Sequence, residues 1–189
     1  MRAHKAPQYG AMDTSTFADN YRLLARYNRW FNQHVYDAGE RLTDEERKRD
    51  RGAFFGSIHN TLNHLMWGDR MWLQRFSAQG VAMPALSARV LDVPAGARHE
   101  TVLYGDWTDL KASRDELDAA IETWTAELPD GFPMLIMRYS NTKGVRREHP
   151  AWQALTHFFN HQTHHRGQVT ALLAQAGADP GTTDLIALV

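Results

Sequence analysis

The stretch Pro150–Gly177, PAWQALTHFFNHQTHHRGQVTALLAQAG, carries the pattern on which the expected fold depends. Its inward-facing residues recur at alternating steps of three and four, the spacing of one face of an α-helix. Pro150 suits the first helical position, and Gly177 suits the cap that ends a helix. The sequence therefore predicts a long helix that continues to Ala176. Its core face consists of Leu155, Phe158, Gln162, His165, Val169, Leu172 and Ala176.

Three earlier segments show the same periodicity. The clearest is Trp107–Leu128, and the others run from Phe17 to about Leu42 and from Phe54 to Ser77. Asp13 or Thr14 is the expected N-cap of the first of these helices. Helices with one apolar face each bury those faces most simply against one another. We therefore expect an all-α protein with an antiparallel four-helix bundle.

The segments between the helices differ in character. Residues 43–51 are polar and charged and predict a simple connection, whereas residues 80–105 contain glycines and prolines that predict a long irregular crossover. Residues 134–139 and 145–148 flank a turn that contains a glycine, a pattern typical of a small β-hairpin. The expected fold is thus a four-helix bundle with a small β-hairpin before the last helix.

Composition limits the function. The chain has 189 residues with 21 Lys and Arg against 22 Asp and Glu, so it lacks the basic field that attracts nucleic acid. It contains no cysteine, so any thiol chemistry needs a sulfur from another molecule. No secretory signal and no apolar run of ~20 residues is present, and we expect no membrane contact and a cytoplasmic location. We expect residues 1–12 to form a flexible tail and residues 13–189 a single domain.

Histidines cluster in the last helix. His157, His161, His164 and His165 fall within nine residues, where an even spread of the 10 histidines would place about 0.5. His161 and His165 are four residues apart and project from one helix face about 6 Å apart along the axis, which suits two ligands of one ion. We assign His157 and His164 to packing or to the surface.

A third ligand is expected from another helix. His64 lies beside the core stripe of the second helix and is the best candidate, with His59 as its competitor. Three neutral imidazoles suit a divalent ion such as zinc, nickel, iron, copper or manganese, and they leave coordination positions for water or substrate. The alternative is that the three histidines are satisfied core residues that bind no metal.

Several polar residues occupy expected core positions. Asn28 and Asp69 would either hydrogen-bond a ligand imidazole or a bound water, or pair with each other or the backbone. Arg166 would form a salt bridge to an acid on a neighbouring helix or bind an anionic substrate. These alternatives stay open at the level of sequence.

Three segments resemble the DinB family of metal-dependent hydrolases. They are TLNHLMWGDRMWL at residues 61–73, FNHQTHHRGQ at residues 159–168 and YNRWFN at residues 27–32, within a resemblance that spans about residues 15–177. The resemblance implies a four-helix bundle of up-up-down-down order, a metal centre on His64, His161 and His165, and a homodimer. The family is unrelated to the DNA polymerase that shares its name.

Enzymes similar to this family include the mycothiol-dependent maleylpyruvate isomerase and the bacillithiol S-transferases, which use a metal to activate a low-molecular-weight thiol. The resemblance therefore implies a metal-dependent S-transferase or hydrolase that acts on a small-molecule substrate. The alternative is a stress protein that binds a metal or a small ligand without catalysis.

Overall fold

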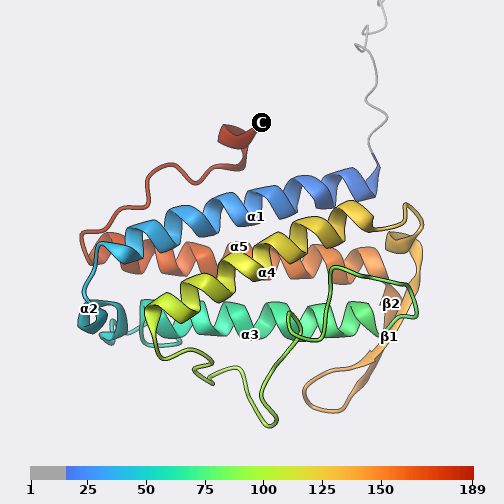
Figure 1. The fold of residues 1–189 in the computed structure, drawn as a ribbon, viewed down its shortest axis with the longest axis horizontal. Helices are drawn as coiled ribbons and strands as arrows, with labels where there is room; N and C mark the ends of the chain where they lie inside the picture. Colours follow the sequence, from blue (N-terminus) through green and yellow to red (C-terminus); the bar gives the residue numbers. More distant parts are fainter. Residues whose placement is uncertain (1–15) are drawn as a thin grey trace, which may run out of the picture.

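The computed structural model describes residues 16–189, and four long helices dominate this part of the chain (Figure 1). They are α1 (Phe17–Glu40), α3 (Ile58–Ser77), α4 (Trp107–Glu127) and α5 (Ala151–Gln175). The expected all-α fold with a hairpin before the last helix is confirmed. The expected N-caps Asp13 and Thr14 and the expected tail at residues 1–12 lie outside the described residues.

The cap of α1 is Thr16, whose hydroxyl accepts a hydrogen bond from the backbone N–H of Asp19, while the Asp19 carboxylate accepts one from the backbone N–H of Thr16. This reciprocal pair is a capping box that satisfies two N–H groups left without helical partners. It fixes the first turn of α1 at Phe17.

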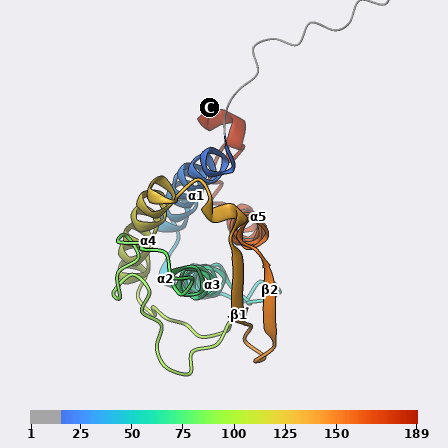
Figure 2. The same cartoon turned by 90° about the vertical axis from the view of Figure 1, so that its right-hand side faces the viewer.

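The helices form a ring in which each packs against two others. α1 contacts α4 and α5, and α3 contacts the same two helices, so α1 and α3 lie diagonally opposite each other (Figure 2). The colours of Figure 1 show that α1 and α5 run in one direction and α3 and α4 in the other. The up-up-down-down order implied by the resemblance is therefore wrong, and the order is up-down-down-up. The reason is that residues 78–106 cross the length of the bundle, which makes α3 and α4 parallel.

The predicted helix faces are the faces that the bundle buries. On α5, the predicted stripe is buried from Leu155 to Leu172, and only its last residue, Ala176, is partly exposed. On α4, Arg114 sits in an otherwise apolar buried stripe. The apolar members of that stripe are Trp107, Leu110, Leu117, Ile121, Trp124 and Leu128.

Three boundaries differ from the sequence-based expectations. The polar connection at residues 43–51 contains a short helix, α2 (Asp44–Lys48), which has acidic residues in its first turn and basic residues in its last, as the helix dipole favours. The second long helix begins at Ile58 rather than Phe54, because Gly56 has a φ of 76° and breaks the helical path. Pro150 precedes α5 instead of opening it.

The hairpin follows a short 3₁₀ helix, η1 (Phe132–Met134), and consists of β1 (Ile136–Ser140) and β2 (Arg146–Pro150). The strands pair antiparallel from Ile136–Pro150 to Ser140–Arg146. The side chain of Gln79, just beyond α3, donates to the carbonyl of Arg138 and accepts from its N–H. These two bonds hold β1 beside the end of α3. Figure 2 shows that the hairpin lies alongside α3 and α5.

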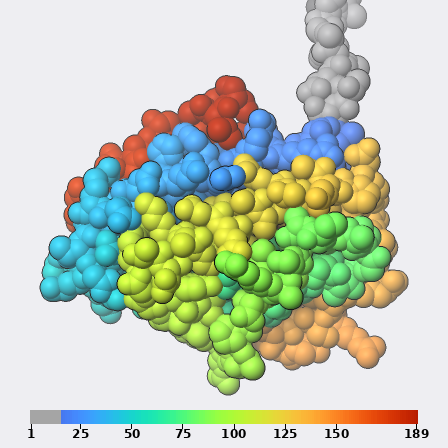
Figure 3. Space-filling view, viewed as in Figure 1, coloured from blue at the N-terminus to red at the C-terminus, as the bar shows by residue number. Residues whose placement is uncertain are grey.

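The remaining segments cover the bundle. The crossover at residues 78–106 spreads over α3 and α4 (Figure 3), as the irregular composition of residues 80–105 predicted. The C-terminal segment ends in a 3₁₀ helix, η2 (Leu185–Leu188), and is tied to α1 by a hydrogen bond of 2.6 Å from the Tyr27 hydroxyl to the carbonyl of Thr183. Among the described helices, none is long and apolar enough to cross a membrane.

Candidate metal centre

Three histidines from two helices meet at one point. The structure brings together His64 of α3 with His161 and His165 of α5, and one ring nitrogen from each lies within 4.8 Å of those of the other two. The ring centroids of His161 and His165 are 4.5 Å apart, as are those of His64 and His165. The two α5 rings converge because their residues lie four apart on one helix face.

One pair of nitrogens in this cluster has the spacing of two metal ligands. The Nε2 atoms of His64 and His161 are 3.2 Å apart. Two nitrogens bound tetrahedrally to zinc at about 2.0–2.1 Å are separated by roughly 3.3–3.4 Å, so these two nitrogens would need little movement to hold an ion.

Hydrogen bonds orient two of the rings. The Nδ1 of His64 lies 2.9 Å from the carbonyl oxygen of His99, and the Nδ1 of His165 lies 2.8 Å from the Oε1 of Gln168. Oxygens of this kind only accept, so each Nδ1 donates and each Nε2 keeps its lone pair. Such bonds to the second nitrogen are typical of histidines that bind metals.

The electrostatic environment keeps the rings neutral. Burial lowers the pKa of His64 to about 4 and that of His161 to about 3, and it also lowers the pKa of His165. At neutral pH the imidazoles therefore carry lone pairs rather than charges. Neutral imidazole is the form that coordinates a metal ion.

Three features around the cluster were not anticipated from sequence. The ring of Phe55 stacks on His64 with centroids 4.0 Å apart. A Cβ on Gly68 would lie 2.8 Å from Cε1 of His161, so the absence of a side chain there makes room for the ring. The carbonyl of His99 comes from the crossover. Of the three, only Gly68 gave a signal, as a glycine inside a helix.

The other histidines have separate roles. His59 is buried, and its Nε2 bonds to the carbonyl of Tyr104 at 2.8 Å, away from the cluster. His157 packs against Trp72 with ring centroids 4.9 Å apart, and His164 is exposed. These placements agree with the packing and surface roles expected for His157 and His164.

The polar core residues pair with one another. Asp69 accepts hydrogen bonds from Arg114 at 2.6 Å and from Gln162 at 3.0 Å, and Asn28 donates to Asp118 at 2.8 Å. Neither Asp69 nor Asn28 forms a hydrogen bond to the histidine cluster. The expected pairing of Asn28 and Asp69 with each other or with the backbone is wrong, because both bond to side chains of other helices. These bonds tie the four helices together beneath the cluster.

Arg166 belongs to the same buried network. Its guanidinium donates to Oδ1 of Asn28 and lies over the ring of Phe31, 4.7 Å from the centroid. Within residues 16–189 it forms no direct ion pair with an acid, so the expected salt bridge is wrong. Arg166 is also fully buried and does not reach a substrate.

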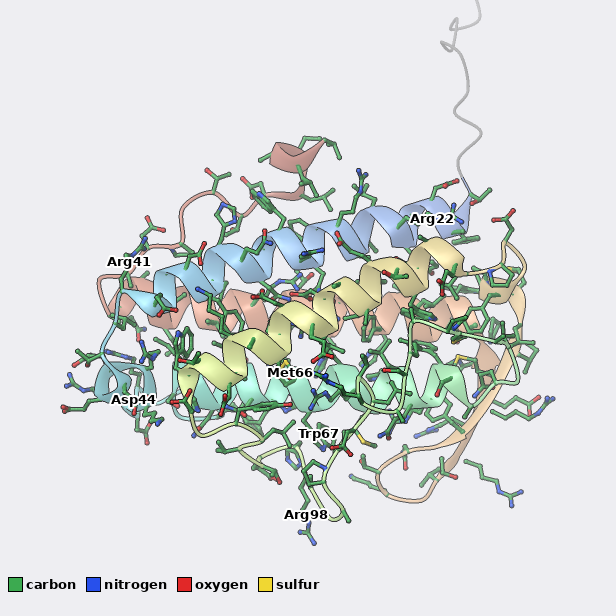
Figure 4. The ribbon with its side chains drawn as sticks, viewed as in Figure 1. Arg22, Arg41, Asp44, Met66, Trp67 and Arg98 are labelled. Atoms are coloured by element: carbon green, nitrogen blue, oxygen red, sulfur yellow. The ribbon has the colours of Figure 1, made fainter. Side chains whose placement is uncertain are left out.

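A cleft of about 330 Å³ opens beside the cluster. In Figure 4, Trp67 on α3 faces the crossover loop, whose tip carries Arg98. Asn141 and Thr142 of the hairpin turn also line the cleft. Its lining includes both aromatic and polar side chains, namely His64, Trp67, Gly68, Met71, Trp72, Arg75, His99, Asn141, Thr142, His157 and His161.

The fold and the site together define a helical-bundle protein with a three-histidine cluster built on two helices beside a cleft. The sequence profile of the DinB family matches residues 12–188. The chain belongs to the DinB family.

Two known proteins are similar to the chain. The protein DinB of Bacillus subtilis (strain 168) is 27% identical over 161 residues, which cover 85% of this chain and 88% of that protein. A DinB-like protein from Bacillus cereus ATCC 10987, known from its crystal structure, is 19% identical with a TM-score of 0.59, and the match covers 88% of this chain and 94% of that one. The second similarity concerns the fold.

Proposed function

We propose that the protein binds one divalent metal ion through the Nε2 atoms of His64, His161 and His165 and is a metal-dependent enzyme. The observation that carries the proposal is the convergence of three neutral imidazoles within 4.8 Å beside a cleft. The donor set fits a zinc, nickel, iron, copper or manganese ion.

The chemistry follows from the number of ligands. Three protein ligands leave room for an exogenous molecule, and a bound ion would act as a Lewis acid that lowers the pKa of a thiol or water. The chain has no cysteine, so a thiol would come from a low-molecular-weight cosubstrate. An S-transferase would use such a thiol, and a hydrolase would use water.

The protein's own residues prepare the site. His99 and Gln168 fix the ring orientations through their oxygens, as described above. The ring of Phe55 stacks on one face of His64. The cleft at Trp67 and Trp72 offers an apolar wall on which a small substrate can pack.

Metal analysis tests the binding. Protein purified without a histidine tag should contain about one divalent ion per chain, and His161→Ala should lose it because two imidazoles hold an ion weakly. His164→Ala is the matched control, because this exposed residue is next to His165 but outside the cluster. Wild-type protein that stays metal-free in the presence of zinc, nickel and iron salts would refute the proposal.

Turnover tests the enzyme assignment. Metal-loaded protein should replace the halogen of a reactive aryl halide with the sulfur of glutathione, bacillithiol or mycothiol, releasing halide and the thiol proton, and His161→Ala should abolish this activity. Turnover of esters or amides without any thiol would assign a hydrolase instead.

One observation favours a second candidate, a protein that binds a metal or small ligand without catalysis. Asp69, the core acid on the helix that carries His64, is fully engaged by Arg114 and Gln162 rather than open to the cleft. It is therefore not placed to act as a general base. Stoichiometric metal binding without any turnover would support this candidate.

A further inference from the structure

We propose that the cleft beside the three histidines binds a small organic molecule bearing a carboxylate, and that Arg75 is the residue that anchors this carboxylate. The inference rests on the proposed function, since it assigns the substrate class of the same site. Arg75 and the cluster residues His64 and His161 line one continuous cleft.

The guanidinium of Arg75 is held in place by aromatic rings. Its central carbon lies 4.6 Å from the ring centroid of Trp72 and 5.1 Å from that of Tyr139. Trp72 comes from α3 and Tyr139 from β1, so the arginine is fixed between the bundle and the hairpin. Stacking fixes the guanidinium plane and leaves its N–H groups available at the edges.

Those N–H groups have no protein partner. Within the described chain, the guanidinium of Arg75 forms neither an ion pair nor a hydrogen bond, although the residue is only partly exposed. Arg114, by contrast, is paired with Asp69 and Asp118, and the guanidinium of Arg70 donates to Ser113. Burial lowers the pKa of Arg75, because its charge is partly removed from water and no counterion compensates for this. An anion in the cleft would supply the missing partner.

The position of Arg75 defines the length of the ligand. It follows His64 by eleven residues on α3, roughly 16 Å along the axis at 1.5 Å per residue. Its side chain leans toward the start of the helix, and therefore toward the cluster. Met71 and Trp72 lie between the two ends and offer an apolar surface. The ligand would thus place its reacting group at the cluster, an apolar middle on Trp72 and its carboxylate at Arg75.

A single negative charge fits this cleft best. Arg75 is the sole Lys or Arg among the described residues that line the cleft. A planar guanidinium can bind a carboxylate with two parallel hydrogen bonds. A single guanidinium at this end of the cleft matches a monocarboxylate rather than a phosphate dianion.

The test compares 8-mercaptooctanoate with the uncharged 8-mercaptooctanol. Calorimetry would give the dissociation constants of both probes for metal-free and for cobalt(II)-loaded protein. We expect the carboxylate to bind about tenfold more tightly in both forms, as a charge-assisted hydrogen-bonded pair allows. Arg75→Gln should remove this preference, and Arg75→Lys should keep part of it, which separates loss of charge from misfolding. Arg146→Gln removes an exposed arginine from the same hairpin and should leave the preference unchanged.

The outcomes separate the two proposals. The visible spectrum of bound cobalt reports the metal site, and the carboxylate preference reports Arg75. The protein could fail to bind cobalt and still prefer the carboxylate probe, with Arg75→Gln removing that preference. This result would refute the metal site and support the carboxylate anchor. Equal affinity for both probes in the wild type, no binding of either probe, or a preference that survives in Arg75→Gln would overturn the inference.

Discussion

At the scale of single residues, Gly68 makes room for the ring of His161 in the cluster, although it has no side chain that could bind a metal ion. Replacing it with alanine would place a Cβ 2.8 Å from Cε1 of His161 and force that ring to move. Because the ring would then leave the spacing it shares with His64, we expect Gly68→Ala to weaken metal binding about tenfold or more. A competition titration against a chromophoric chelator measures the change.

Gly167→Ala is the matched control for that substitution. Gly167 also lies inside a long helix, but a Cβ there would meet nothing within 4 Å. This variant should bind metal like the wild type and gain about 1 kcal/mol in the free energy of unfolding, because alanine is the better helix former. Equal metal affinity in both alanine variants would contradict the positioning role of Gly68.

The sequence could predict part of the site at this scale. His161 and His165 were recognised because ligands four residues apart on one helix follow from helical geometry alone. The contribution of the His99 carbonyl could not be predicted, because it depends on the path of an irregular crossover. The role of Arg75 could not be predicted, because it depends on a guanidinium without a protein partner. Only the folded structure shows which groups are partners.

At the scale of the helices, a buried polar network joins all four members of the bundle. Asp118 of α4 accepts hydrogen bonds from Asn28 and Asn32 of α1 and from Arg114. Asp118→Asn would remove one charge of a buried ion pair and one acceptor of this network. We expect it to lower the free energy of unfolding by about 3–5 kcal/mol, measured by urea denaturation.

Glu122→Gln provides the comparison on the same helix. Glu122 lies one turn after Asp118 and pairs with Arg29 at 2.6 Å, but both side chains of this pair are partly exposed. Its loss should cost less than about 1 kcal/mol, because water already screens the pair. If Asp118→Asn were as mild as Glu122→Gln, the network would not be a determinant of stability.

The helices themselves were predictable because each carries one apolar stripe. The short helix α2 could not be predicted, because all five of its residues are charged and form no apolar stripe. The direction of α4 relative to α3 is set by how far residues 78–106 travel, and their composition does not encode that distance. The four long helices were therefore predictable to within a few residues, whereas their up-down-down-up order was not.

At the scale of the whole molecule, the homodimer stays a prediction from the resemblance. Phe17 and Met134 expose more than half of their apolar side chains and offer surface that a second copy could bury. Sedimentation equilibrium should give twice the chain mass of 21.6 kDa. A mass of one chain at micromolar concentration would contradict the prediction.

Metal binding should also stabilise the whole fold. His64 and His161 are 97 residues apart in sequence, so the unfolded chain does not hold them together and binding favours the folded state. Zinc at 100 times its dissociation constant should raise the free energy of unfolding by about 2.7 kcal/mol and the Tm by roughly 5–11 °C. His64→Ala should lose this shift, whereas His59→Ala should keep it, even if its own Tm is lower, because His59 bonds to Tyr104 away from the cluster. If zinc raised the Tm of His64→Ala by the same amount, the ion would bind elsewhere. The histidines at the contact of α3 and α5 would then not form the metal site.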